Sequence, residues 1–372
     1  MNRKHRIPIA RSYNMKKQIP FTKGAYMQHY PYLKKVPWII TILFLFFLLT
    51  IPSPCVGEAK HLLRIGTGGL TGVYYQVGKL IAQGLTEPVE GKKALEAGVQ
   101  GVPGYIGVAQ NSAGSIENVR AVASGEIELG IVQADVVAWA FRSEHVFAGD
   151  KSARGVRAVA SLYPEKFQIV TRRDANIRNV LDLRGKRISV DEIGSGTLSV
   201  MRIVLEAHGL SEKDLLPVYL KPVFTHDKMV KGDLQGFVMM AGAPMEAVTQ
   251  LYGIGISLVP IAPEMALRIS SQYPYLVPGK IPAGVYSGIP DTPTVQVHAI
   301  LVVSAAMHED LVYQVTASLW SERTLSLLKR GHPQGKSITP QTALVGISIP
   351  LHPGAERFYR EHRMFKKGTP SP

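Results

Sequence analysis

The sequence has little cysteine and no long hydrophobic run. Cys55 is the only cysteine among 372 residues, which excludes a disulfide-stapled scaffold. The longest apolar run, Trp38 to Ile51, has fourteen residues, fewer than the roughly 20 of a membrane-spanning helix. The chain also lacks a G-x-S-x-G motif, an H-E-x-x-H motif and any cluster of cysteine and histidine. Neither a Ser-His-Asp hydrolase nor a zinc site is therefore indicated.

Acidic residues are absent from the N-terminal segment. Residues 1–37 hold nine Lys or Arg and no Asp or Glu, so they supply nine of the formal net charge of +14. The remaining +5 is spread along the chain, without a basic stripe interleaved with aromatic residues. This distribution disfavours a nucleic-acid-binding role.

The first 59 residues have the pattern of a secretory signal peptide. A long basic segment precedes the short apolar run, prolines follow it, and Gly57 and Ala59 supply small residues before a cut at Lys60. A start at Met27 would give a leader of ordinary length, and an uncleaved N-terminal anchor is the alternative reading. Cleavage after Ala59 would leave a mature chain without cysteine, suited to an oxidising compartment. We therefore expect export to the periplasm or another extracytoplasmic space.

From Leu62 onward, strand-like and helix-like segments alternate, which predicts α/β layers with mostly parallel sheets. The expected strands are 128–132, 156–160, 168–170, 187–190, 236–240, 255–259 and 297–303. The expected helices are 114–124, 197–208, 244–252, 263–272 and 309–329. Segment 273–294 is rich in proline and glycine, so we expect an irregular functional loop or a connector there.

Two stretches of the chain, separated by roughly 105 residues, echo one another. Residues 124–132 lead into 133–135, and residues 231–239 lead into 240–242. In each stretch a Gly-acid turn precedes a buried strand, a small polar loop and a new helix. The echo predicts two lobes built alike.

The loop Gly66–Gly72, GTGGLTG, lies between an apolar strand and an amphipathic helix that begins near Val73. Free amides and threonine hydroxyls at a helix start attract an anion. The spacing fails the dinucleotide fingerprint, because the third glycine falls one place late and no acid ends a second strand about 20 residues on. A simple tight turn is the alternative to an anion site. Since adjacent helix positions point apart, one of Tyr74 and Tyr75 is expected to face the ligand.

A second loop, Asp191–Thr197, repeats this combination after the strand-like RISV and before an apolar-periodic helix. A plain Ser or Thr N-cap would explain its hydroxyls. The same arrangement in both halves of the chain favours two anion cradles that hold opposite ends of one small acidic molecule.

Further polar residues stand where a ligand site is expected. Asn111 and Ser115 precede a predicted helix, and Gln133 and Asp135 follow a buried strand. Open α/β sheets bind ligands beyond the carboxyl ends of their strands. Asp135 either receives an ammonium group or caps its own helix.

Several segments, in this order, resemble the TAXI family of TRAP-transporter solute receptors. They are IGTGGLTGVYYQVG, GSIENVRAVASGEIELGIVQAD, ASLYPE, DLRGKRISV, GSGT, IPAGVYSG, DTPTV, HEDLVYQVT and IPLHPGAERFYRE. Together they span Leu63 to Glu361. The resemblance implies a type II periplasmic-binding-protein fold, an α/β architecture of two similar lobes with a hinge and a ligand cleft.

The resemblance also implies a domain organisation. Residues 1–59 form the signal peptide and residues 60–164 the first part of lobe 1. Residues 165–275 form lobe 2. Residues 276–372 form the return segment, the hinge and C-terminal helices that pack on lobe 1.

The family's ligands are acidic, typically glutamate-like amino acids or dicarboxylates such as 2-oxoglutarate. The motifs carry ligand contacts over to Thr67, Gly68, Gly69, Tyr74, Tyr75, Asn111, Ser115, Gln133, Asp135, Ser195, Gly196, Thr197, Ala241 and Gly242. The chain departs from the family where VAQNSAGS replaces a T-G-G-S-like motif, at Asn111 and Ser112. It departs again at Met239 and Met240, where aromatic residues are common and the size of the pocket is set.

The resemblance implies a binding protein with no catalytic residues, cofactor or metal. Its partners would be a small acidic solute and the membrane subunits of a sodium-coupled TRAP transporter. An exported sensory protein that reports a ligand to a signalling partner is the alternative.

Overall fold

The computed structural model describes residues 59–88 and 101–364. Cys55 and all but the last residue of the predicted signal peptide lie outside these ranges. Contacts divide the chain into residues 1–57 and 58–372, and the fold below is that of the second unit. No helix within the described ranges is both long enough and apolar enough to cross a membrane.

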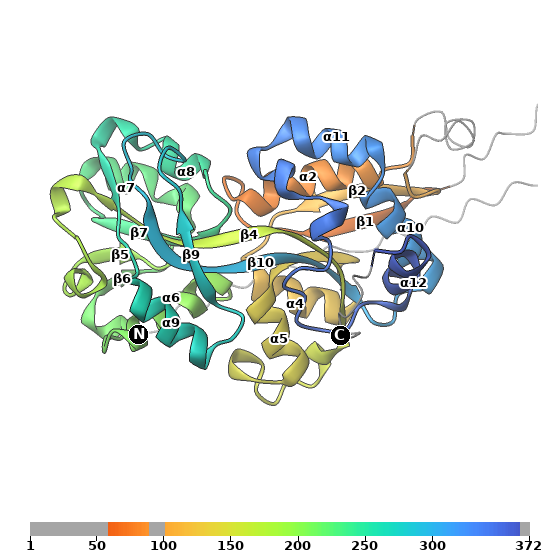
Figure 1. Ribbon diagram of the computed structural model, residues 1–372, viewed down its shortest axis with the longest axis horizontal. Helices are drawn as coiled ribbons and strands as arrows, with labels where there is room; N and C mark the ends of the chain where they lie inside the picture. The colour runs from red at the N-terminus through yellow and green to blue at the C-terminus, as the bar shows by residue number, and fades with distance from the viewer. Residues whose placement is uncertain (1–58, 89–100, 365–372) are drawn as a thin grey trace, which may run out of the picture. The chain divides into compact units, whose positions relative to one another are not determined.

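The first group of elements, which we call lobe 1, is built around three parallel strands (Figure 1). They are β1 (His61–Gly66), β2 (Tyr105–Gln110) and β3 (Leu129–Gln133), in the order β2-β1-β3. The helices between and after them are α2 (Val73–Leu85), α4 (Ser115–Ser124) and α5 (Ala134–Arg142). All five residues of β3 are buried, as expected for a central strand covered on both faces.

The second group, which we call lobe 2, repeats the α/β pattern. Its strands are β5 (Arg187–Ser189), β6 (Leu216–Val218), β7 (Gly236–Ala241) and β8 (Ile256–Leu258). Its helices are α6 (Gly196–Ala207), α7 (His226–Lys231), α8 (Glu246–Thr249) and α9 (Pro263–Gln272). Strands β7, β5 and β6 are parallel neighbours.

Two long antiparallel strands, β4 (Val156–Arg172) and β10 (Thr292–Ser304), belong to both lobes (Figure 1). The last part of β4 pairs with β7, while the last part of β10 pairs with β3. One sheet therefore runs through the unit in the order β2-β1-β3-β10-β4-β7-β5-β6. This order, with two strands crossing between the lobes, is that of a type II periplasmic binding protein and confirms the predicted α/β fold class. The expectation of mostly parallel sheets was wrong, because β4 and β10 run antiparallel to their neighbours and make five of the nine strand pairings in the described residues antiparallel. The predicted lobe boundary at 164/165 falls inside β4.

The C-terminal helices α10 (Glu309–Leu319), α11 (Glu322–Gly331) and α12 (Pro353–Glu361) return to lobe 1. Helices α10 and α11 pack on α2, and α12 packs on α10. The Tyr359 hydroxyl donates a hydrogen bond to the Val159 carbonyl of β4 at 2.8 Å and accepts one from Trp320 Nε1 at 3.0 Å. These buried bonds anchor α12 to the lobe 1 end of a crossing strand.

The predicted internal echo appears as two matching helix ends. Gly125 ends α4 with φ of 76°, and Gly232 ends α7 with φ of 81°. Only glycine adopts this left-handed conformation without steric cost. The strands that follow are β3 and β7, and both end at the same pocket.

Some expected elements differ from the observed ones. Segment 273–294 is not irregular, because it contains β9 (Val277–Ile281) and the first residues of β10. Within the described residues β9 pairs only with β10, and an edge strand of this kind tolerates proline.

The expected helix 244–252 is only the short helix α8, followed by a 3₁₀ turn at Tyr252–Ile254. Two further differences concern continuity. The expected strands 156–160 and 168–170 are one strand, β4, because the polar residues between them lie where the strand crosses from lobe to lobe. The expected helix 309–329 is two helices, since Ser321 starts α11 as an N-cap that accepts a hydrogen bond from the Thr324 N–H.

Candidate functional site

A pocket opens where elements of both lobes meet beside the crossing strands. It contains about 540 Å³ of free space, including the part open to solvent. Lobe 1 lines it with Gly68, Gly69, Thr71, Gly72, Val73, Tyr74, Ala113, Gly114, Ser115 and Gln133. Lobe 2 and β4 add Glu165, Asp191, Gly196, Thr197, Lys221, Pro222, Val223, Met239, Met240 and Ala241. A tight pocket of this kind suits a small solute.

Three helix starts contribute to the pocket wall. Helices α2 and α4 begin after Gly72 and Gly114, neither of which has a side chain to cap the first N–H groups. Helix α6 begins after Ser195, whose hydroxyl accepts only the Leu198 N–H at 3.1 Å. The first N–H groups of a helix lack intrahelical partners and lie at its positive end. The pocket wall therefore presents neutral donors for an anionic group.

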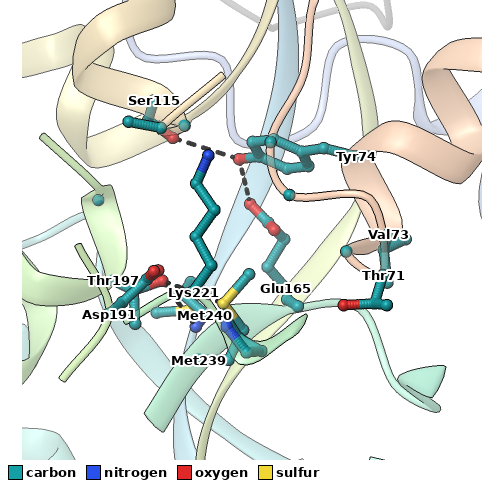
Figure 2. Close-up of a pocket in the computed structure, with 18 of the residues that line it drawn as sticks. Thr71, Val73, Tyr74, Ser115, Glu165, Asp191, Thr197, Lys221, Met239 and Met240 are labelled. Atoms are coloured by element: carbon teal, nitrogen blue, oxygen red, sulfur yellow. Dashed lines mark hydrogen bonds between the residues drawn. The ribbon is translucent and has the colours of Figure 1, made fainter. Parts of the chain in front are cut away.

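Glu165 projects into the pocket from β4 (Figure 2). Its side chain is 1% exposed, and its Oε2 accepts a hydrogen bond from the Tyr74 hydroxyl at 2.7 Å. Burial raises the pKa of Glu165 well above its ordinary value, although the Tyr74 bond opposes this, and nearby Asp135 raises the pKa further. Within the described residues, Oε1 of Glu165 has no hydrogen-bond partner. Glu165 thus presents an unsatisfied acceptor to the pocket.

Asp191 and Lys221 form the opposite wall, in lobe 2. Asp191 has φ of 68° and accepts the Glu192 N–H at 2.8 Å, and burial raises its pKa to about 6. The Lys221 ammonium lies 3.0 Å from Glu192 Oε1 and donates to the Ser112 carbonyl in lobe 1, also at 3.0 Å. Lys221 therefore bridges the two lobes beside the pocket (Figure 2).

The two lobes also touch at the start of α6. A Cβ on Gly196 would lie 2.5 Å from the amide nitrogen of Gln133, which is 3% exposed. A Cβ on Gly194 would lie 3.8 Å from that of Ala113. Glycine at position 196 thus lets the α6 start approach Gln133 at the end of β3.

Eight of the fourteen predicted contact residues line this pocket: Gly68, Gly69, Tyr74, Ser115, Gln133, Gly196, Thr197 and Ala241. Thr197 also has a structural role, because its hydroxyl accepts the Met240 N–H at 3.2 Å. Of the two tyrosines, Tyr74 is buried at the pocket, whereas Tyr75 is half-buried with the Lys79 ammonium 5.6 Å from its ring centre.

The other predicted residues lie beside the pocket or away from it. Thr67 is fully buried and its hydroxyl donates to the Gln110 carbonyl at 2.7 Å, which ties the ends of β1 and β2 together. Asn111 is exposed and lines a separate groove, formed mostly by lobe 1 with Ile193 and Gly194 of lobe 2. Ser195 caps α6. Gly242 packs against Gln334.

Asp135 lies in the first turn of α5, behind the pocket wall. It is 1% exposed, and burial raises its pKa to about 7 despite nearby backbone N–H groups. Neither of its oxygens has a hydrogen-bond partner in the part of the chain that the structure describes. Asp135 does not line the pocket, so its effect on a solute would pass through Glu165.

Three ionisable lining residues were not predicted from the sequence: Glu165, Asp191 and Lys221. A charged residue in the apolar stretch ASLYPEKFQIV was an available signal for Glu165. Asp191 stands at the head of the second loop, although only Ser195 to Thr197 were selected there. Lys221 follows β6 in an unremarkable stretch and reaches the pocket only through the tertiary fold.

The pocket offers a solute hydrogen-bonding and charged groups. Over residues 59–88 and 101–364, no three His, Cys, Asp or Glu side chains gather closely enough to hold a metal ion. Helix-start amides suit a carboxylate or similar anion, while Glu165 and Asp191 suit a hydrogen-bond donor or cation.

Comparison with known proteins gives a family match and distant structural likenesses. The model of the NMT1-like family matches residues 65–362. The periplasmic aliphatic sulphonate binding protein SsuA from Escherichia coli is 14% identical, with a TM-score of 0.40, over 82% of this chain and 94% of that one. A putative L-cystine ABC transporter from Listeria monocytogenes is 11% identical, with a TM-score of 0.43, over 75% and 98% of the two chains.

The ligand-binding component of an ABC-type import system from Staphylococcus aureus, with zinc bound, is 10% identical. Its TM-score is 0.43, over 82% of this chain and 93% of that one. At these scores and identities, none of the three assigns a solute or a transporter class to this chain. The family match is different in kind, because it spans nearly all the described residues, and it shows that the chain belongs to the NMT1-like family.

Proposed function

We propose that this protein is an exported, non-enzymatic solute-binding protein that captures a small carboxylate-bearing solute in the pocket between its lobes. The candidates are a glutamate-like amino acid or a dicarboxylate such as 2-oxoglutarate. The solute would then be delivered to the membrane subunits of a TRAP-type, sodium-coupled transporter.

The observation that carries the proposal is the meeting of helix starts from two lobes at one small pocket. The uncapped starts of α2 and α4 face it from lobe 1, and the start of α6 faces it from lobe 2. Donors of this kind are preorganised and neutral, so a carboxylate is held with little reorganisation.

The crossing strands supply the mechanism. Because β4 and β10 each pair with strands of both lobes, small changes in their backbone would rotate one lobe against the other. A solute that touches both walls stabilises the closed form by its differential affinity. The Lys221 bridge and the close approach of Gly196 to Gln133 support a closed arrangement in this structure.

The TRAP assignment rests on the ordered series of motifs that resemble the TAXI family. The signal-peptide pattern supports export. Closure around the solute would change the surface shown to the membrane subunits and so couple binding to delivery.

Mass spectrometry of solute co-purified with the exported protein tests the proposal directly. Isothermal calorimetry against acidic amino acids, 2-oxo acids and dicarboxylates gives the affinity. Uptake into vesicles that carry the candidate membrane subunits, with and without a sodium gradient, tests the partner.

We expect one class of acid to release or absorb heat and to raise the melting temperature. If no carboxylate-bearing solute binds or co-purifies, the proposed function is wrong. Binding without sodium-dependent uptake would leave the solute assignment intact and overturn the TRAP assignment.

A further inference from the structure

The pocket contains two buried acceptor oxygens without partners. They are Oε1 of Glu165 and Oε1 of Gln133, and neither has a hydrogen bond within the described residues. The two side chains are 1% and 3% exposed and both line the pocket. A buried acceptor left unsatisfied costs about 1–3 kcal/mol, and more if it is charged. Two such groups facing one cavity indicate a solute that donates several hydrogen bonds.

The charges around the pocket point to the same kind of solute. Glu165 and Asp191 stand on opposite sides of it, on β4 and after β5. Among the described lining residues Lys221 is the only cation, and its ammonium lies against Glu192. Burial favours the neutral form of Glu165 in the empty pocket, and a cationic group of the solute would shift it to the ionised form. A solute with only negative charges would bring no such cation and would find none free in the pocket wall.

The remaining contacts of Glu165 leave one of its oxygens for the solute. The Tyr74 hydroxyl donates to Oε2 at 2.7 Å and thereby fixes the orientation of the carboxyl group. The Gln133 backbone is fixed as well, because its N–H donates to the Ser115 hydroxyl at 3.1 Å. Both acceptors are thus preorganised on rigid elements, at the crossing strand and at the end of β3.

Building on the proposed function, we propose that Glu165 and Gln133 receive a protonated amino group of the solute. An ammonium carries three donors and a positive charge, so it satisfies both oxygens at once. The carboxylate of the same solute would lie at the helix starts. Glu165 is then the residue that selects amino acids over the corresponding 2-oxo acids and plain dicarboxylates.

Calorimetry with matched solutes tests this selectivity. L-glutamate, 2-oxoglutarate and glutarate share a five-carbon dicarboxylate chain and differ at one carbon, and L-alanine with pyruvate or L-leucine with its 2-oxo acid extend the comparison. We expect at least one amino acid to bind about 30-fold or more tightly than its 2-oxo counterpart, in line with a charge-assisted hydrogen bond.

Glu165→Gln keeps the shape of the side chain and removes its charge, so it should weaken binding of that amino acid by about 30-fold or more. Glu144→Gln, at an exposed position, is the matched control and should bind as the wild type does. Melting temperatures of both variants check that they fold.

The outcomes separate the two proposals. A 2-oxo acid or dicarboxylate that binds as tightly as its amino acid overturns this inference and leaves the proposed function standing. So does a folded Glu165→Gln variant with unchanged affinity. If none of these solutes binds, the proposed function fails and this inference fails with it. If Glu165→Gln does not fold, the affinities of the wild-type protein for amino acids and for their 2-oxo counterparts still test this inference.

Discussion

Replacing Asp135 by asparagine should make the protein more stable at neutral and alkaline pH. The side chain is 1% exposed and has no hydrogen-bond partner among the described residues, and burial raises its pKa from 3.8 to about 7. The native state therefore keeps the proton that the unfolded chain has already lost. Stability from the neutral carboxyl group is fully present below pH 3.8 and is lost as the pH rises through about 7.

The size of the effect follows from the shift. At about 1.4 kcal/mol per pKa unit, the ionised carboxylate of Asp135 lowers the free energy of unfolding by about 4 kcal/mol at pH 8. Asparagine has the same shape and no charge. Between pH 5 and pH 8, the stability of Asp135→Asn relative to the wild type should rise by about 3 kcal/mol. Asp135 also raises the pKa of Glu165, so the substitution lowers the pKa of Glu165. This second effect likewise makes the variant more stable than the wild type at high pH.

Urea unfolding at several pH values, followed by circular dichroism, measures the difference. Asp233→Asn, at an exposed position, is the control and should follow the wild-type pH dependence. If the stability difference between Asp135→Asn and the wild type were the same at pH 5 and pH 8, the reasoning from burial would be refuted.

Two further predictions concern the contact between the lobes. Gly196→Ala would place a Cβ 2.5 Å from the Gln133 amide and push that amide aside, so solute affinity should fall about tenfold and the free energy of unfolding by about 1–3 kcal/mol. Gly253→Ala, where a Cβ meets nothing within 4 Å, is its control, and equal calorimetric affinities for the two variants would contradict the prediction. Lys221→Met keeps an unbranched side chain one atom shorter and loses the 3.0 Å hydrogen bond to the Ser112 carbonyl, so the unliganded protein should open. Solution scattering should then show a larger radius of gyration, and an unchanged radius would argue against a bridge.

Periodicity and turn chemistry were sufficient to predict most of the fold from the sequence. The repeated Gly-acid turn predicted before two strands corresponds in the structure to the left-handed helix ends at Gly125 and Gly232. The predicted bounds of helices and strands were wrong where tertiary packing overrides the local sequence pattern. Proline at an edge strand was one such place, and Ser321, which divides an otherwise continuous helical pattern, was another.

The residues of the candidate site likewise fall into those that the sequence could predict and those that it could not. Residues at or just before helix starts, such as Gly68 and Ser115, could be placed because helix starts attract ligands whatever the rest of the fold does. Glu165 and Lys221 could not, since their positions depend on how β4 crosses between the lobes and on how the loop after β6 folds back. Asp135 is the opposite case. Its position after a buried strand predicted a ligand contact, whereas in the structure it is buried behind the pocket wall, near Glu165.

In the proposed binding mode, the anion and the amino group of the solute are recognised by different parts of the chain. The donors for an anion are backbone N–H groups at the starts of α2, α4 and α6, and side-chain substitution leaves such donors in place. The unsatisfied acceptors belong to the side chains of Glu165 and Gln133, which a single substitution alters. Met239 and Met240 likewise line the pocket with flexible side chains that set its size. A change of solute within this scaffold would therefore begin at β4, at the end of β3 and at β7, while the anion cradle stayed the same.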